Sequence, residues 1–182
     1  LINDCSVEKY IGKTVEEISE ENNRDPFEMA LDIIKESGNN VMMIVFFMAE
    51  EDVSRTIFNE YSMICTDGIP SFGKYHPRYI GSFIRVLEKY TKQEGLLSLP
   101  KAVNKMTKMP ADKLGIKDRG TIDEGMKADI LVLDYDELKD NSDFINHDLT
   151  ASGIDYVIIN GEIGVANGKY NGIKNGKVLR KE

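Results

Sequence analysis

The sequence predicts an α/β fold with two regions of different character. In the first region, stretches of helical periodicity alternate with apolar runs at residues 41–47 and 61–66, in the order helix, strand, helix, strand. From residue 119 onward, glycines separate short apolar runs, which is typical of a β-rich region. We therefore place a boundary near residue 118 and expect two domains, residues 1–118 and residues 119–182.

Two helices are expected before the first apolar run. Thr14 and Glu17 have the spacing of a capping box, in which each residue satisfies an amide of the other at a helix start. Asp25 can cap a second helix, because Pro26 follows it and proline is favoured in the first helical turn. We expect the buried face of this second helix to consist of Phe27, Ala30, Leu31 and Ile34.

The two apolar runs are expected to be neighbouring parallel strands. Residues 41–47 are continuously apolar, as strands covered on both faces are. Residues 50–59 carry acidic side chains at their start, which favours a helix that crosses between the two strands. Such a unit is the repeat of an α/β barrel, but two strands cannot close a barrel and leave their edges unpaired.

Further helices and a hairpin are expected after the second run. Helical patterns cover residues 79–92 and 98–106, and a short helical turn is expected at residues 111–114. Asn160-Gly161 stands between two apolar runs and is typical of a two-residue hairpin turn.

Composition excludes two classes of partner. The chain has 182 residues, of which 41% are hydrophobic, and a formal net charge of -8. Nucleic-acid binding depends on clustered cations, and this acidic chain has no concentrated Lys/Arg stripe. Its apolar runs fall short of the roughly 20 residues that a bilayer-spanning helix needs. We therefore expect no nucleic-acid partner, no membrane partner and a cytoplasmic location.

Asp67 is the first candidate for a functional residue. It directly follows the second apolar run and precedes Gly68. Catalytic groups of α/β barrels lie at the C-terminal tips of strands, so Asp67 is a candidate metal ligand or proton shuttle. The alternative is an ordinary turn, since Asp-Gly is a common turn dipeptide. Cys65, two residues earlier, is expected to be a small core side chain.

Four strings carry a resemblance to a known family. They are TDG at residues 66–68, GKYHPR at residues 73–78, the long stretch at residues 94–134, and VIINGE at residues 157–162. Together they resemble the C-terminal part of the metal-dependent amidohydrolases, most closely the N-acyl-D-amino-acid deacylases or D-aminoacylases. The resemblance implies the last part of a TIM-like (β/α)8 barrel in residues 1–118, and strands of a small β-sandwich in residues 119–182.

The resemblance also implies a reaction and a set of site residues. It implies a zinc-dependent hydrolase that converts an N-acyl-D-amino acid to a D-amino acid and a carboxylate. Asp67 would be a metal ligand and the general acid/base. The guanidinium fork of Arg78 suits a substrate carboxylate, and His76 lines the same loop as a second substrate-binding candidate. The alternatives are a surface arginine and a histidine held in a proline turn.

Two further polar residues are expected to have no catalytic role. Asp129 stands at the start of an apolar run, where a carboxylate commonly accepts hydrogen bonds from turn amides. His147 lies in the polar string Asn146-His147-Asp148 and is expected to face solvent.

The family draws its other metal ligands from earlier strands, including a His-X-His pair that this chain lacks. The chain has two histidines, His76 and His147, and begins at Leu1. We therefore expect a C-terminal fragment, inactive alone and with zinc absent or weakly bound, whose partners are the remainder of its own chain or, by self-association, further copies. Two alternatives remain: a fragment of a cyclic-amide hydrolase such as dihydropyrimidinase, and a non-catalytic interaction module with a polar, closed surface.

Overall fold

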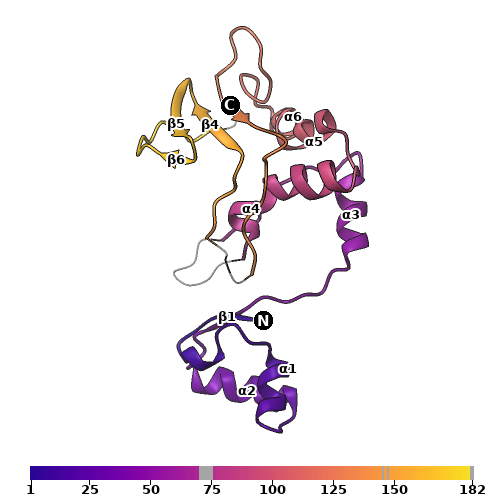
Figure 1. Cartoon of the computed structure of the whole chain (residues 1–182), viewed down its shortest axis with the longest axis vertical. Helices are drawn as coiled ribbons and strands as arrows, with labels where there is room; N and C mark the ends of the chain where they lie inside the picture. The colour runs from indigo at the N-terminus through magenta and orange to yellow at the C-terminus, as the bar shows by residue number, and fades with distance from the viewer. Residues whose placement is uncertain (70–75, 145, 147, 181–182) are drawn as a thin grey trace.

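The chain is seen in a computed structural model that describes residues 1–69, 76–144, 146 and 148–180. An N-terminal unit lies at one end of the molecule, and an extended segment leads from it to a larger body (Figure 1). The body combines several helices with a four-stranded sheet. The expected α/β class is therefore confirmed.

The N-terminal unit consists of a two-stranded sheet packed with two helices. Its elements are β1 (Ile2–Cys5), the short helix η1 (Glu8–Tyr10), α1 (Val15–Glu21), α2 (Pro26–Glu36) and β2 (Val41–Met43). The capping box of Thr14 and Glu17 is confirmed at the start of α1. At the start of α2, the side chain of Asp25 accepts hydrogen bonds from the backbone N–H groups of Phe27 and Glu28.

The predicted buried face of α2 is wrong. The helix buries Met29 and Ile33 against a core formed by Ile2, Cys5, Tyr10 and Ile18. Phe27 and Leu31, which were expected inside, are 72% and 51% exposed. Met29 and Ile33 are also one turn apart, so α2 is apolar on two faces, and the periodicity does not decide which face meets a neighbour.

The body contains the expected helices. They are α3 (Glu50–Phe58), α4 (Arg78–Arg85), η2 (Val86–Gln93), α5 (Leu99–Met106) and α6 (Lys108–Leu114). The helix expected at residues 79–92 is thus continuous in space but changes from α-helix to π-helix at Val86. All of these helices except α6 share one core with the region after residue 130, built from Ile57, Ile84, Val86, Leu87, Tyr90, Leu97, Ala102 and Leu138.

The C-terminal sheet is antiparallel and follows the chain order. It contains β3 (Ile130–Leu133), β4 (Ile154–Ile159), β5 (Glu162–Ala166) and β6 (Lys169–Tyr170). The hairpin expected at Asn160-Gly161 is confirmed between β4 and β5. Both turn residues have positive φ, 50° and 84°, as a type I′ turn requires.

The two predicted parallel strands are not formed in the described part of the chain. Residues 41–47 were expected to be a buried strand, but only β2 is a strand, and it pairs antiparallel with β1. Phe46 and Phe47 are 64% and 82% exposed. Tyr61 lies in a turn, and residues 62–66 have no regular secondary structure. A parallel barrel strand needs neighbours on both edges and layers on both faces, and the described residues supply neither at these two runs.

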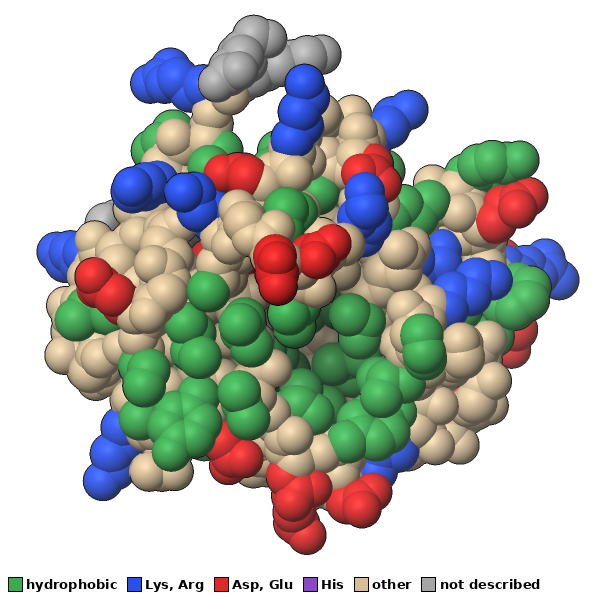
Figure 2. Space-filling model, turned by 90° about the horizontal axis from the view of Figure 1, so that it is seen from above, with side chains coloured by type: hydrophobic (Ala, Val, Ile, Leu, Met, Phe, Trp, Pro, Cys, Tyr) green, Lys and Arg blue, Asp and Glu red, His purple; other side chains and the backbone are tan. Residues whose placement is uncertain are grey.

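One face of the molecule gathers exposed apolar side chains. Figure 2 views the end of the molecule opposite to the N-terminal unit, where hydrophobic side chains gather around a hollow. Gathered apolar side chains of this kind mark contact surfaces.

Within the described residues, no helix is both long and apolar enough to cross a bilayer.

Substitution of Leu138 can test whether the helices and the C-terminal region share one core. The residue is 1% exposed and belongs to the core cluster of the body. We expect Leu138→Ala to lower the free energy of unfolding by about 2–5 kcal/mol, because it removes buried contacts and leaves a cavity. Leu114→Ala is the matched control, since Leu114 is 61% exposed. Urea unfolding of both variants measures the difference, and equal losses would contradict the shared core.

Candidate functional site

Asp67 ends the segment at residues 62–67, which has no regular secondary structure. Its backbone has a φ of 46°, in the left-handed region that aspartate tolerates better than most residues. The side chain of Thr66, not that of Asp67, accepts the hydrogen bond from the backbone N–H of Gly68 at 3.2 Å. The carboxylate of Asp67 is 77% exposed. Asp67 therefore presents its carboxylate outward instead of using it to close the turn.

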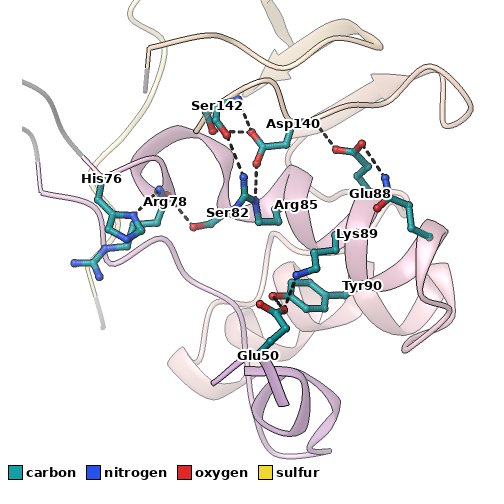
Figure 3. Close-up of polar contacts among 11 residues, drawn as sticks. Glu50, His76, Arg78, Ser82, Arg85, Glu88, Lys89, Tyr90, Asp140 and Ser142 are labelled. Atoms are coloured by element: carbon teal, nitrogen blue, oxygen red, sulfur yellow. Dashed lines mark hydrogen bonds and ion pairs between the residues drawn. The ribbon is translucent and has the colours of Figure 1, made fainter. Parts of the chain in front are cut away.

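The structure brings Asp67, Arg78 and His76 together. Nη2 of Arg78 lies 3.1 Å from Oδ2 of Asp67. The backbone N–H of Arg78 donates to Nδ1 of His76 at 3.0 Å, at the start of α4 (Figure 3). Because Nδ1 accepts this bond, a neutral His76 carries its proton on Nε2. His147 and residues 73–75 of the GKYHPR string lie outside the described residues.

Gly68 allows the Asp67 segment to approach α4 closely. A Cβ atom added at Gly68 would lie 2.8 Å from Cα of Tyr79 and 2.6 Å from Cδ2 of the same residue. Distances this short to backbone atoms cannot be relieved by a side-chain rotation. The sequence suggested a glycine that turns the chain, but the structure shows a glycine required for close contact.

His76 lies in a partly apolar environment. Its ring meets the ring of Phe144 edge to face with centroids 5.1 Å apart, and Phe144 meets Phe46 in the same way at 4.9 Å. Burial lowers the pKa of His76, and the positive charges of Arg78 and Arg85 lower it further. His76 is therefore neutral at pH 7 and can donate a hydrogen bond through Nε2.

An ion pair with a buried carboxylate anchors the far end of the helix that begins with Arg78. Nε of Arg85 lies 2.8 Å from Oδ2 of Asp140, whose side chain is 4% exposed (Figure 3). Oδ1 of Asp140 accepts hydrogen bonds from the backbone N–H and the hydroxyl of Ser142, at 3.0 Å and 2.6 Å. A Cβ atom at Gly81 would lie 2.4 Å from the Ser142 hydroxyl, so α4 docks tightly here. In the sequence, the signal that could have indicated this close contact is Gly81 itself, a glycine inside a helical pattern.

A second polar cluster joins α3 to the π-helix. Oε1 of Glu50 accepts hydrogen bonds from Nζ of Lys89 and from the hydroxyl of Tyr90, both at 2.6 Å (Figure 3). The bond from Lys89, followed by that from Tyr90, lowers the pKa of Glu50. Burial and then the bond to Glu50 raise the pKa of Tyr90. This cluster fixes the start of α3, the helix that leads into the Asp67 segment.

Asp129 has the role that the sequence predicts, whereas Cys65 does not. Oδ1 of Asp129 accepts the backbone N–H of Asn160 at 2.8 Å, and its other oxygen pairs with Arg119. Burial alone would raise the pKa of Asp129, but these two partners together lower it. The turn role of Asp129 is confirmed. The expectation for Cys65 is wrong, because its side chain is exposed.

The described residues alone do not make a zinc site. They contain no group of three or more His, Cys, Asp or Glu side chains placed to hold a metal ion. Zinc in proteins takes three or four such ligands. Asp67 can supply one carboxylate, and in this structure that carboxylate is paired with Arg78.

Comparison with known proteins defines the class of protein to which this site belongs. A model described as "Amidohydrolase family" matches residues 64–165, more than half of the chain and the part that carries Asp67, His76 and Arg78. The chain belongs to the amidohydrolase family.

Three relatives show which members of the family are similar. The N-acyl-D-glutamate deacylase of Alcaligenes xylosoxydans xylosoxydans is 41% identical over 118 residues, which are 65% of this chain and 24% of that protein. A D-aminoacylase structure, whose report concerns a binuclear metal center, has a TM-score of 0.89 at 32% identity. The N-acyl-D-glutamate deacylase of Bordetella bronchiseptica, solved with zinc and a phosphonate inhibitor, has a TM-score of 0.86 at 30% identity.

The matches cover nearly all of this chain but only part of each solved chain. The D-aminoacylase match spans 100% of this chain and the Bordetella match 99%, but each spans only 37% of the solved chain. The chain thus has the fold of about a third of an amidohydrolase of this kind.

The environment of His76 predicts its titration. Burial and the two arginines hold its pKa below the ordinary value of 6.5. The folded state therefore favours neutral imidazole, and this contribution to stability is present above pH 6.5 and lost as the pH falls through the folded pKa. An NMR titration of the ring protons of this chain should give a midpoint below 6.5, with His147→Gln assigning the two histidines. A midpoint at or above 6.5 would show that the ring is solvated.

Proposed function

We propose that this chain is the C-terminal part of a zinc-dependent amidohydrolase that cleaves N-acyl-D-amino acids into a D-amino acid and a carboxylate. The observation that carries the proposal is the pairing of Asp67 with Arg78 beside His76, inside the region that matches the family. Similarity to three deacylases acting on N-acyl-D-amino acids supports this substrate class.

In this proposal the ion pair exchanges partners when substrate binds. Both members are solvent-accessible, with side chains 42% and 77% exposed for Arg78 and Asp67, so their mutual attraction is weak. A substrate α-carboxylate offers the Arg78 guanidinium two oxygens in a planar fork. Arg78 then turns from Asp67 to the substrate, and the carboxylate of Asp67 becomes free to move a proton.

Asp67 is the general acid/base in this proposal. Hydrolysis of an amide requires removal of a proton from the attacking water and delivery of a proton to the leaving nitrogen. A carboxylate at the exposed end of a segment anchored at its base can do both. His76, neutral and with Nε2 as its donor, is placed to bind a polar group of the substrate near Arg78.

Zinc belongs to the longer protein in this proposal. Asp67 is one of its ligands, and the ligands that the described residues do not supply come from the remainder of the polypeptide. When bound, zinc acidifies a water molecule and polarises the amide carbonyl. Metal is expected to be absent from this chain alone or bound only weakly.

The exposed apolar runs support the incomplete nature of the chain. Residues 45–48 and 61–63 include Phe47 and Tyr61, which are 82% and 79% exposed. An interaction module with a polar, closed surface would not expose such side chains.

We propose that residues 1–118 contribute to a (β/α)8 barrel and residues 119–182 to a β-sandwich. The remainder of the chain, or in its absence another copy, covers these runs. A cytoplasmic location remains part of the proposal.

The incompleteness of the site predicts that this chain by itself is inactive. Purified chain incubated with zinc should retain less than one equivalent after desalting, because Asp67 alone cannot complete the coordination. No hydrolysis of N-acetyl-D-glutamate above the rate in buffer is expected. Metal analysis and a D-amino-acid assay measure both quantities. Tightly held zinc together with turnover would sink the fragment proposal.

Substitutions in the longer protein separate the two proposed roles. Asp67→Asn should lower kcat by about 10²- to 10⁴-fold, since it removes the proton-transfer group at constant size. Arg78→Ala should raise KM by about 10- to 100-fold, the value of a hydrogen-bonded charge. Arg55→Ala, on the exposed side of α3, is the control and should leave both constants unchanged. Undiminished kcat in Asp67→Asn would rule out the role given to this carboxylate.

A further inference from the structure

Lys105 is buried in the body but is not part of the site described above. It lies on α5 and is 1% exposed, which makes it one of the largest fully buried side chains. Its ammonium group donates hydrogen bonds to the carbonyl and the hydroxyl of Ser62, at 2.8 Å and 3.0 Å, and to the carbonyl of Asn59. Burying a charge is unfavourable, so these neutral oxygen partners require an explanation.

The partners of Lys105 define the base of the Asp67 segment. Asn59 is the C-cap residue of α3, where helix carbonyls without helical partners favour a nearby cation. Ser62 begins the segment that ends at Asp67. The ammonium therefore joins the end of α3 to the start of the segment, and both are fixed to α5.

A second contact of Lys105 fixes the register of the same segment. Its backbone carbonyl accepts the N–H of Ile64 at 3.2 Å. Ile64 also packs against the core of the body. Lys105 thus holds the segment through its side chain at Ser62 and through its backbone at Ile64. Three residues further on, Asp67 leaves the core with an exposed carboxylate.

Stability alone does not call for a charge at this position. Buried ionic groups replaced by apolar side chains of similar volume often leave a protein equally stable or more stable. Methionine approximates the length of lysine and would fill the same space. The feature that methionine cannot reproduce is the directed bonding to two carbonyls and a hydroxyl.

We infer that Lys105 is a positioning residue, which sets the register and direction of residues 62–67 and thereby places the Asp67 carboxylate beside Arg78. The inference rests on the function proposed for Asp67. A proton-transfer group displaced by about 1 Å loses on the order of 10²-fold in rate. Loss of the Lys105 bonds therefore acts on kcat while the binding group, Arg78, stays on its own helix.

The chain carries a built-in probe for this role. Cys65 lies between the Lys105 contacts and Asp67 and is exposed, whereas Cys5 is buried. A nitroxide label on Cys65, with Cys5 replaced by alanine in every variant, reports the mobility of the segment by electron paramagnetic resonance. Lys105→Met removes all hydrogen bonds of the Lys105 ammonium group, and Ser62→Ala removes only the one to the Ser62 hydroxyl. Lys113→Met, at an exposed lysine of α6, is the control.

We expect a mobile label in Lys105→Met, an intermediate one in Ser62→Ala and an unchanged one in Lys113→Met. In the longer protein, Lys105→Met should lower kcat by about 100-fold with KM changed by less than about twofold. Circular dichroism checks the fold of each variant. If Lys105→Met does not fold, Ser62→Ala decides by the same two readouts.

An unchanged label spectrum in folded Lys105→Met, or in Ser62→Ala if it replaces that variant, overturns the inference whatever the reaction is. A mobile label with unchanged kcat overturns it as well, provided that Asp67→Asn is inactive. If Asp67→Asn retains full turnover, the proposed function fails, and with it the catalytic meaning of Lys105. The label and the Asp67 variant thus distinguish the two failures.

Discussion

The ion pair of Asp67 and Arg78 depends on two supports from different parts of the chain. Asp67 is carried by a segment without strand pairing whose base is held by Lys105. Arg78 begins α4, whose other end is held by the pair of Arg85 with the buried carboxylate of Asp140. Gly68 lets the two parts approach within contact distance of each other.

The two ion pairs of α4 differ in the burial of their carboxylates. The side chain of Asp140 is 4% exposed and its second oxygen accepts a hydrogen bond from Ser142, so this carboxylate is held in place although its partner Arg85 is 42% exposed. The pair of Asp67 and Arg78 is largely exposed and accordingly weak. The function proposed above uses this difference, because in that proposal α4 stays in place while Arg78 changes its partner from Asp67 to the substrate.

The molecule has two separate hydrophobic cores with an exposed apolar run between them. The core of the body joins helices to the region after residue 130, and the N-terminal unit has a small core of its own. Between them, the most apolar run of the sequence lies exposed, with Phe46 and Phe47 at 64% and 82%. The chain belongs to the amidohydrolase family and covers 37% of the D-aminoacylase chain that it matches. In the function proposed above, these exposed residues contact the part of the longer protein that the match does not cover.

The sequence by itself determined the local elements. The capping box at Thr14, the cap at Asp25 and the Asn160-Gly161 hairpin depend on residues within a few positions of each other, and each was confirmed. The strings around Asp67 and Arg78 also indicated the family correctly. Only the tertiary structure decided which face of α2 is buried, that residues 41–47 and 61–66 do not form parallel strands here, and that Lys105 and Asp140 support the site. The buried face of α2 depends on a core that includes Ile2 and Ile18. The contacts of Lys105 and Asp140 depend on partners 43 and 55 residues away, and the two strands depend on neighbours that the described residues lack. Local periodicity carries no information about any of these.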